Sequence, residues 1–149
     1  MLFVADSMLG KLARYLRIMG YDTIYQKSYP YQRLPELVME GRILLTRTHS
    51  TYRLYSNSIF IDNDLVKDQL KVVDSILKLT RDRRDWFSRC LICNSSLSKA
   101  DGEAVRENVP DFVFFHYPER ILFCPTCKRF YWPGTHRERM LERFKDWGF

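Results

Sequence analysis

The chain has 149 residues, of which 46% are hydrophobic and 28% charged, and its formal net charge at pH 7 is +6. This length supports one ordinary hydrophobic core plus a small appendage, and the composition excludes a disordered protein. No apolar run approaches the roughly 18 residues of a membrane-spanning helix, and the first residues lack a secretory signal. We therefore expect a cytoplasmic protein with no membrane partner. The positive charge suits a polyanionic partner, and it would serve solubility equally well.

The first half of the chain alternates between segments typical of buried strands and segments typical of amphipathic helices. After a strand at 2–6, apolar residues recur at helical spacing between Ser7, a suitable N-cap, and Gly20, a stop signal. Further strands are expected at 22–25, 42–46 and 58–61, with helices at 34–40 and 65–79. The predicted order is β-α-β-α-β-β-α. Such alternation predicts an α/β fold with a mostly parallel sheet that is covered on both faces.

A polar break, TRDRRD at 80–85, follows the last of these helices. We place a domain boundary there, which gives an α/β domain at 1–80 and a second, smaller domain at 81–149. The second domain holds two Cys-x-x-Cys pairs, Cys90 with Cys93 and Cys124 with Cys127.

The two cysteine pairs predict a structural zinc site. Cysteines of a cytoplasmic protein stay reduced, which favours metal ligation over disulfides. Four thiolates can converge tetrahedrally on Zn²⁺, and a unit this small could hardly fold without such a staple. Two alternatives are less favoured than zinc, namely four unrelated buried thiols and redox-active pairs. Redox chemistry would need only one Cys-x-x-Cys pair. The 30 residues between the inner cysteines exceed the common spacing of about 15–20, so this intervening segment, which includes residues 110–118, is expected to add strands or a loop.

Acidic residues follow two of the predicted strands. Asp6 ends the first strand, and Asp62 and Asp64 follow the strand at 58–61. In open α/β folds the carboxyl edge of the sheet is where the chemistry lies. Asp64, however, is better explained as the N-cap of the next helix, and Asp6 could also serve as a helix cap. Carboxylates that converge at this edge would bind Mg²⁺ or Mn²⁺, which would activate water and neutralise charge on a phosphodiester.

Basic residues gather in both segments that follow strand ends. On the first helix they recur at intervals of three, as Lys11, Arg14 and Arg17. After the strand at 42–46, Arg47 and Arg53 alternate with aromatic rings. A mixture of charge and stacking rings binds single-stranded RNA. A solvated helix face would give the same pattern on the first helix.

The segments FVADSMLGKLARYLRIMGYDT, GRILLTRT, RCLICNSSL and FCPTCKRFYWPGTH follow one another along the chain. Together they resemble the PIN-like ribonuclease domain found at the C-terminus of Mut-seven exonucleases, over nearly the whole chain. The resemblance implies a three-layer PIN-like α/β domain followed by a zinc ribbon with a C-terminal helix, and metal-dependent cleavage of RNA. Position by position, it implies that Asp6 is the first-strand metal acid and Asp22 the GYD aspartate. It also implies that His136 belongs to the motif after the last cysteine pair.

The sequence departs from the family at two places. The third strand of the family usually ends Thr-Arg-Asp, whereas this chain has Thr46-Arg47-Thr48. An acid is also common upstream of the short helix, and residues 28–33 hold none. A neutral threonine is a weak substitute for a carboxylate in holding a hard divalent cation. The fold and the RNA affinity could survive this loss while cleavage does not.

These observations leave three readings. The first is an endoribonuclease that acts on single-stranded RNA with Asp6, Asp22 and Asp62 around Mg²⁺ or Mn²⁺, weakened by Thr48. The second is a catalytically degenerate module that binds structured RNA, such as ribosomal RNA, within a ribonucleoprotein. The third is an adaptor that binds a protein partner through the zinc ribbon. In the first two, the RNA-binding residues would be Lys11, Arg14, Arg17, Arg47, Arg53 and His136.

Overall fold

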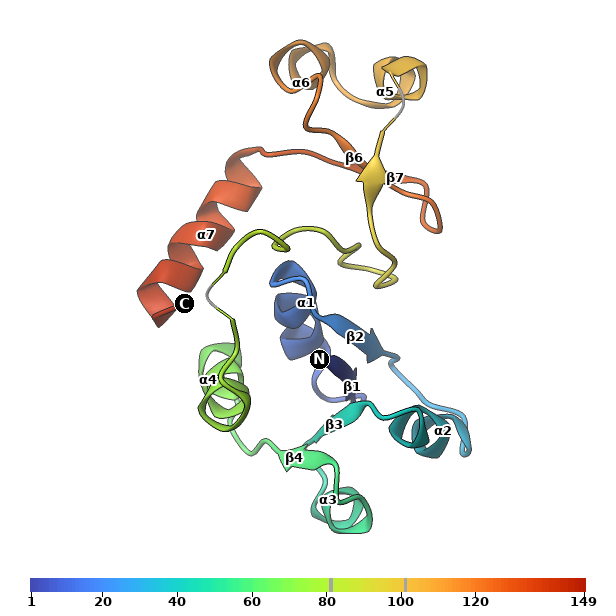
Figure 1. Ribbon diagram of the computed structural model, residues 1–149, viewed down its shortest axis with the longest axis vertical. Helices are drawn as coiled ribbons and strands as arrows, with labels where there is room; N and C mark the ends of the chain where they lie inside the picture. The colour runs from blue at the N-terminus through green and yellow to red at the C-terminus, as the bar shows by residue number, and fades with distance from the viewer. Residues whose placement is uncertain (81, 101) are drawn as a thin grey trace. The chain divides into compact units, whose positions relative to one another are not determined.

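The computed structural model describes residues 1–80, 82–100 and 102–149. It divides into two compact units, Met1–Asn94 and Ser95–Phe149, which are described separately below (Figure 1). The expected second domain begins at Arg81, a residue that lies outside the described residues. The first unit continues to Asn94 and thus includes the first cysteine pair.

The first unit is built on a four-stranded sheet in which all neighbouring strands are parallel, as predicted. Its strands, in the spatial order β2-β1-β3-β4, are β1 (Leu2–Ala5), β2 (Asp22–Tyr25), β3 (Ile43–Thr46) and β4 (Ser58–Phe60). The register pairs Ala5 with Leu45 and Leu45 with Ile59. The carboxyl ends of β1, β3 and β4 therefore meet at one edge, which we call the carboxyl edge.

Helices cover both faces of this sheet and give a three-layer unit. They are α1 (Gly10–Ile18), α2 (Arg33–Met39), α3 (His49–Leu54) and α4 (Val66–Leu77). Figure 1 shows α1 and α4 on one face and α2 and α3 on the other. The sequence did not predict α3, although two adjacent parallel strands such as β3 and β4 need a crossover connection. None of its residues is buried, and Leu54 is 75% exposed. A helix that buries no face needs no regular spacing of apolar residues, so the sequence carries no signal for it.

The core of the first unit follows from the two periodicities of the sequence. Val4 and Leu44 point to one face of the sheet and pack with Leu37 of α2, while their strand neighbours point to the other face. On α1, Leu12 and Leu16 lie one turn apart and are fully buried. Burial of a leucine side chain contributes about 1.5–3 kcal/mol, so these positions fix α1 against the sheet.

The ends of α1 differ in part from the prediction. The helix begins at Gly10 rather than beside Ser7, which is exposed. The preceding turn is organised by Asp6, whose Oδ1 accepts a hydrogen bond from the Met8 backbone at 2.9 Å. Gly20 does end the helical segment, with φ +88°, and a Cβ there would lie 2.5 Å from the Asp85 carbonyl oxygen. Both its conformation and its surroundings therefore require glycine.

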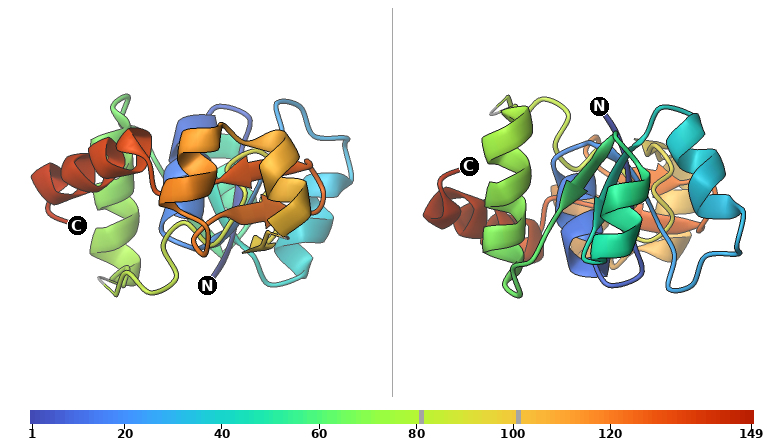
Figure 2. Two further views of the ribbon diagram at one scale, coloured as in Figure 1. Left: turned by 90° about the horizontal axis from the view of Figure 1, so that it is seen from above. Right: turned by 90° about the horizontal axis from the view of Figure 1, so that it is seen from below.

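The second unit holds a three-stranded antiparallel sheet in the order β5-β6-β7, which are Ser98–Lys99, Leu122–Cys124 and Arg129–Tyr131. The chain adds α5 (Gly102–Asn108) and α6 (Asp111–His116) between β5 and β6, and α7 (Thr135–Trp147) after β7. Figures 1 and 2 show α5 and α6 side by side.

The segment between the inner cysteines does add a short strand, β5, but its residues 110–118 lie mostly in α6 rather than in a strand or a loop. Pro110 precedes the helix in an extended conformation, and Val113 packs with Val105, Val109 and Ile121. This packing overrides the preference of the valine and phenylalanine residues for strands. Within the described ranges, no helix has the length and apolar content that crossing a membrane requires.

Candidate functional site

Asp6 is the central polar group at the carboxyl edge. Its side chain follows β1 and is buried, with the residue 8% exposed. Oδ1 accepts the Met8 backbone N–H at 2.9 Å, and Oδ2 accepts both the Thr46 hydroxyl and the Arg47 backbone N–H at 2.7 Å. Asp6 therefore ties the ends of β1 and β3 together and also organises the turn into α1. Asp6 lies at the strand edge but is not the N-cap of α1, a position that Leu9 occupies without a side-chain capping bond.

The Thr46-Arg47-Thr48 segment crosses the same edge. The Thr46 hydroxyl donates to Asp6 and accepts the Thr48 backbone N–H at 3.0 Å. Thr48 itself is exposed, stands at the N-cap position of α3 and makes no side-chain capping bond. A side chain at position 48 is thus free to change without disturbing the edge.

The two acids after β4 are held by Arg47. Its guanidinium donates to the Asp62 carbonyl at 3.3 Å and to the Asp64 carboxylate at 2.7 Å. The Asp62 side chain is exposed. Asp64 is not the residue at the N-cap of α4, a position that Leu65 occupies. A cation already lies beside these acids, in the form of Arg47.

Asp22 lies at the opposite end of the sheet. It is the first residue of β2 and pairs in register with Leu2, so it does not join Asp6 at the carboxyl edge. Its Oδ1 accepts Arg42 Nη1 at 2.6 Å and Asn94 Nδ2 at 2.9 Å. Burial acts to raise the pKa of Asp22, but the hydrogen bonds from Arg42 and Asn94 outweigh it and lower the pKa below its usual value. This carboxylate is a structural ion-pair partner.

The predicted set of three catalytic acids is therefore not assembled. Among the residues that the structure describes, the four cysteines are the only group of three or more acids, histidines and cysteines whose ligand atoms come close enough to share a metal ion. An ionised carboxylate has about four lone-pair positions, and donors from the protein take three of those on Asp6. The carboxyl edge does not form a complete site for Mg²⁺ or Mn²⁺.

Tyr29 is a residue of this edge that the sequence reasoning missed. Its hydroxyl donates to the Ala5 carbonyl at 2.7 Å and accepts the Gln26 backbone N–H at 3.1 Å. Burial raises its pKa to about 12, and nearby Asp6 acts in the same direction. Tyr29 is therefore a neutral hydroxyl beside the end of β1. It belongs to the segment at 28–33 that was noted only for lacking an acid.

The predicted RNA-binding residues fall into separate places. Lys11 and Arg14 are exposed on α1, whose first turn follows the carboxyl edge. Arg47 lies at the edge itself. Arg53 is exposed in the last turn of α3, a helix that Figure 1 shows on the opposite face of the sheet from α1. His136 is exposed at the start of α7 in the second unit.

Arg17 does not share the exposed side of α1. It is 4% exposed, and its Nε donates to the Thr23 carbonyl at 2.9 Å. Each residue of an α-helix turns the chain by about 100°, so a spacing of three drifts by about 60° per step around the axis. Two such steps from Lys11 carry Arg17 off the polar side and against β2. Its guanidinium is not available to a phosphate.

The four cysteines come together as predicted. The sulfur atoms of Cys90, Cys93, Cys124 and Cys127 all lie within 4.8 Å of one another. Four thiolates at the Zn–S distance of about 2.3 Å would place their sulfurs roughly 3.8 Å apart, so the donor set suits a tetrahedral Zn²⁺. These residues could hold one zinc ion, which would act as a structural crosslink.

Both cysteine pairs share one backbone geometry. The Asn94 N–H donates to the Cys90 carbonyl at 3.0 Å, and the Lys128 N–H donates to the Cys124 carbonyl at 2.9 Å. Asn94 and Lys128 each have a left-handed conformation, with φ of 72° and 56°. The Cys127 N–H also points to Cys124 Sγ, at 3.3 Å. Each Cys-x-x-Cys thus forms a closed turn that presents its two sulfurs together.

Comparison with known protein families gives a match over almost the whole chain. The family model described as the Mut7-C RNAse domain matches residues 1–144. No curated protein matches the chain. The matched range includes the carboxyl edge and all four cysteines.

Proposed function

The chain belongs to the Mut7-C RNAse domain family, and from that premise we propose that it binds single-stranded RNA at the carboxyl edge and cleaves it slowly. Membership of the family supports a nuclease-like function that involves RNA. The slow rate and the position of the RNA are inferred from the residues at the edge. The cytoplasm remains the compartment that we expect, because it would keep four clustered thiols reduced.

One observation carries the proposal of weak cleavage, namely that protein donors already occupy the Asp6 carboxylate. Three hydrogen bonds leave it about one lone-pair position for an external ligand. Mg²⁺ is usually held by one or two protein carboxylates together with water and phosphate. Where the family has a second acid, this chain has Thr48, whose side chain is exposed beside the edge. A divalent ion would supply charge neutralisation and an activated water, but this edge would hold it loosely.

The proposed RNA surface consists of Lys11 and Arg14 on α1 together with Arg47 at the edge. The first two are exposed, and neither has a pairing carboxylate among the described ion pairs. They lie in the first turns of α1, directly after Asp6 and the turn that it organises. Phosphates bound by these cations would bring the RNA backbone to the edge. His49 and Tyr52 of α3 already pack on Phe60, with ring centroids 4.0 and 5.8 Å apart, so we assign base stacking to neither.

The test is RNA binding by the double variant Lys11→Glu/Arg14→Glu, measured by fluorescence anisotropy with a labelled single-stranded RNA over a range of salt concentrations. Two lost phosphate contacts should reduce the slope of log affinity against log salt by about 1.4, at about 0.7 per contact. The matched control is Lys71→Glu/Lys78→Glu, which changes net charge equally at exposed positions in the middle of α4 and at its C-cap. Weaker binding by the control than by the α1 variant would place the RNA surface elsewhere.

The second candidate function is a degenerate RNA-binding module, and the incomplete acid set supports it. Under that function the α1 variant would still lose affinity, but no divalent ion would produce cleavage. A structured RNA, including ribosomal RNA, would then compete with the single-stranded probe. A protein partner of the cysteine-bearing region remains a third hypothesis, for which the residues described here give no specific contact.

A further inference from the structure

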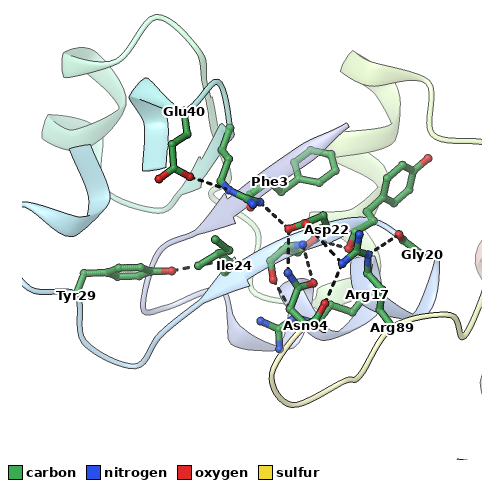
Figure 3. A network of polar contacts seen from close by, with 12 residues as sticks. Phe3, Arg17, Gly20, Asp22, Ile24, Tyr29, Glu40, Arg89 and Asn94 are labelled. Carbon is green, nitrogen blue, oxygen red and sulfur yellow. Dashed lines mark hydrogen bonds and ion pairs between the residues drawn. The ribbon is translucent and has the colours of Figure 1, made fainter. Parts of the chain in front are cut away.

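The first cysteine pair lies in a short segment, 89–94, that side chains of the first unit hold in place (Figure 3). Arg17 Nη1 donates to the carbonyls of Leu91 and Ile92, at 3.1 and 2.9 Å. These are the two residues between Cys90 and Cys93. Because Arg17 also donates to the Thr23 carbonyl, one guanidinium joins the turn between the two sulfurs to both α1 and β2.

Asn94 closes the same segment from its other end. Its Oδ1 accepts the Thr23 backbone N–H at 2.9 Å, and its Nδ2 donates to the Asp22 carboxylate at 2.9 Å. β2 is an edge strand of the sheet, so no further strand pairs with its outer side. The Asn94 amide instead hydrogen-bonds the Thr23 N–H and the Asp22 carboxylate on that side. Asn94 thus serves both ends of the contact: its backbone, in a left-handed conformation, completes the cysteine turn, and its side-chain amide bonds β2.

Arg89 adds a third connection. Its Nε donates to the Gly20 carbonyl at 3.0 Å, and its Nη1 donates to the Asn94 carbonyl at 2.9 Å and lies 3.5 Å from Asp22. Asp22 is in turn fixed by Arg42. The segment 89–94 is thus attached to the end of α1 and the start of β2 by several charged hydrogen bonds, which are stronger than neutral ones.

The charge on Arg17 also matches the metal site. Burial lowers the pKa of Arg17, and negative charge on Cys90 and Cys93 opposes that shift. The guanidinium bonds the two residues that lie between these cysteines. A zinc ion with four thiolates has a net charge of −2. A buried cation beside two of those thiolates reduces the cost of burying the complex, and removal of its partners would leave a buried charge uncompensated.

We propose that Arg17 and Asn94 are positioning residues for the zinc site, and that they couple metal binding to the stability of the β2 side of the first unit. The hydrogen bonds fix the turn that carries Cys90 and Cys93 before the ion binds. Because coupling is reciprocal, the bound ion in turn stabilises the contacts of Arg17 and Asn94 with β2. This inference is independent of the proposed function, since it requires neither RNA nor cleavage.

The experiment uses the full chain with the variants Arg17→Met and Asn94→Gly. Glycine at 94 keeps the left-handed backbone and removes only the amide. Arg14→Met is the matched control, because it removes an exposed arginine from the same helix. Zinc affinity is measured by competition with a chromophoric chelator, and site geometry from the visible spectrum of the Co²⁺-loaded protein. We expect Arg17→Met to lower zinc affinity by about 10–100-fold, the range typical for groups that orient metal ligands, and Arg14→Met to leave it unchanged.

A second readout separates positioning from a general loss of stability. The thermal midpoint of each protein is compared with zinc and with excess chelator. If the residue is coupled to the metal site, chelation lowers the thermal midpoint less in the variant than in the wild type. If its role is purely structural, the substitution lowers the midpoints with and without zinc equally. If Arg17→Met does not fold, Asn94→Gly and Arg17→Lys decide. Lysine keeps the charge but lacks the planar fork by which Nε bonds Thr23 while Nη1 bonds the turn between the cysteines. Wild-type zinc affinity in those variants would overturn the proposal.

Discussion

Thr46→Val is expected to be among the most destabilising conservative changes at the carboxyl edge. Thr46 is fully buried, and valine has nearly its shape. The hydroxyl donates to the Asp6 carboxylate at 2.7 Å and accepts the Thr48 N–H at 3.0 Å. A hydrogen bond to a charged group contributes about 1.5–3 kcal/mol and a neutral one about 0.5–1.5 kcal/mol. The expected loss in the free energy of unfolding is therefore about 2–4.5 kcal/mol.

The matched control is Thr48→Val, two residues away. Its hydroxyl is exposed and makes no capping bond, so the change should stay within about 0.5 kcal/mol. Urea unfolding followed by circular dichroism measures both variants, and equal m-values would show that the surface exposed on unfolding is unchanged. Hydrogen exchange at the Arg47 and Thr48 amides gives a local check. The Thr48 amide loses its acceptor, and the Arg47 amide bonds the same Asp6 oxygen that loses the Thr46 hydroxyl. A Thr46→Val protein as stable as Thr48→Val would refute the view that Asp6 is held by this network.

Three further predictions concern the metal, the backbone and the pH dependence. Protein purified without added zinc should contain about one equivalent of the metal. A chelator should unfold the second unit, Ser95–Phe149, and metal-free protein with that unit folded would contradict the site. Gly20→Ala should destabilise the protein more than Gly41→Ala. Alanine at positive φ costs about 1–2 kcal/mol at either position, but only at 20 would its Cβ also clash with backbone, at the Asp85 carbonyl. Equal losses in the free energy of unfolding in urea would contradict the clash. Because the pKa of Asp22 is lowered in the folded protein, the carboxylate stabilises the fold above the unfolded-state pKa of about 3.9. This stabilisation is lost as the pH falls through the folded-state pKa. The difference in unfolding free energy between wild type and Asp22→Asn should therefore narrow from pH 6 to pH 3, and a difference that widens would contradict the ion pair.

Much of the first unit could be predicted because its local signals agree with one another. The strands at β1 to β4 are apolar runs that end in polar residues, and α1 and α4 carry regular apolar faces. Parallel order follows from alternation, and the shared edge follows from parallel order. The cysteine cluster could be predicted because ligand type and spacing identify it without knowledge of the fold.

The misses have physical causes. α3 buries none of its residues, so no apolar period reveals it. Asp22 was placed among the site acids by the family resemblance alone, as the GYD aspartate. It begins its strand, and in a parallel sheet the start and the end of a strand lie at opposite edges. Arg17 looked exposed because a spacing of three was read as a straight row, whereas the helical rotation carries it into the interior. Tyr29 gave no signal at all, since its role depends on a hydrogen bond to β1.

The central claim is that the carboxyl edge around Asp6 is the active site and that the missing acid at position 48 limits it. The most direct measurement is single-turnover cleavage of a labelled single-stranded RNA by the wild type, Thr48→Asp and Thr48→Asp/Asp6→Asn, at equal concentrations, with Mn²⁺, Mg²⁺ or chelator. We predict slow or no cleavage by the wild type and faster cleavage by Thr48→Asp. The gain should be largest with Mn²⁺, which binds such sites more tightly than Mg²⁺. It should be lost in Thr48→Asp/Asp6→Asn. Efficient cleavage by the wild type that survives Asp6→Asn would contradict the claim.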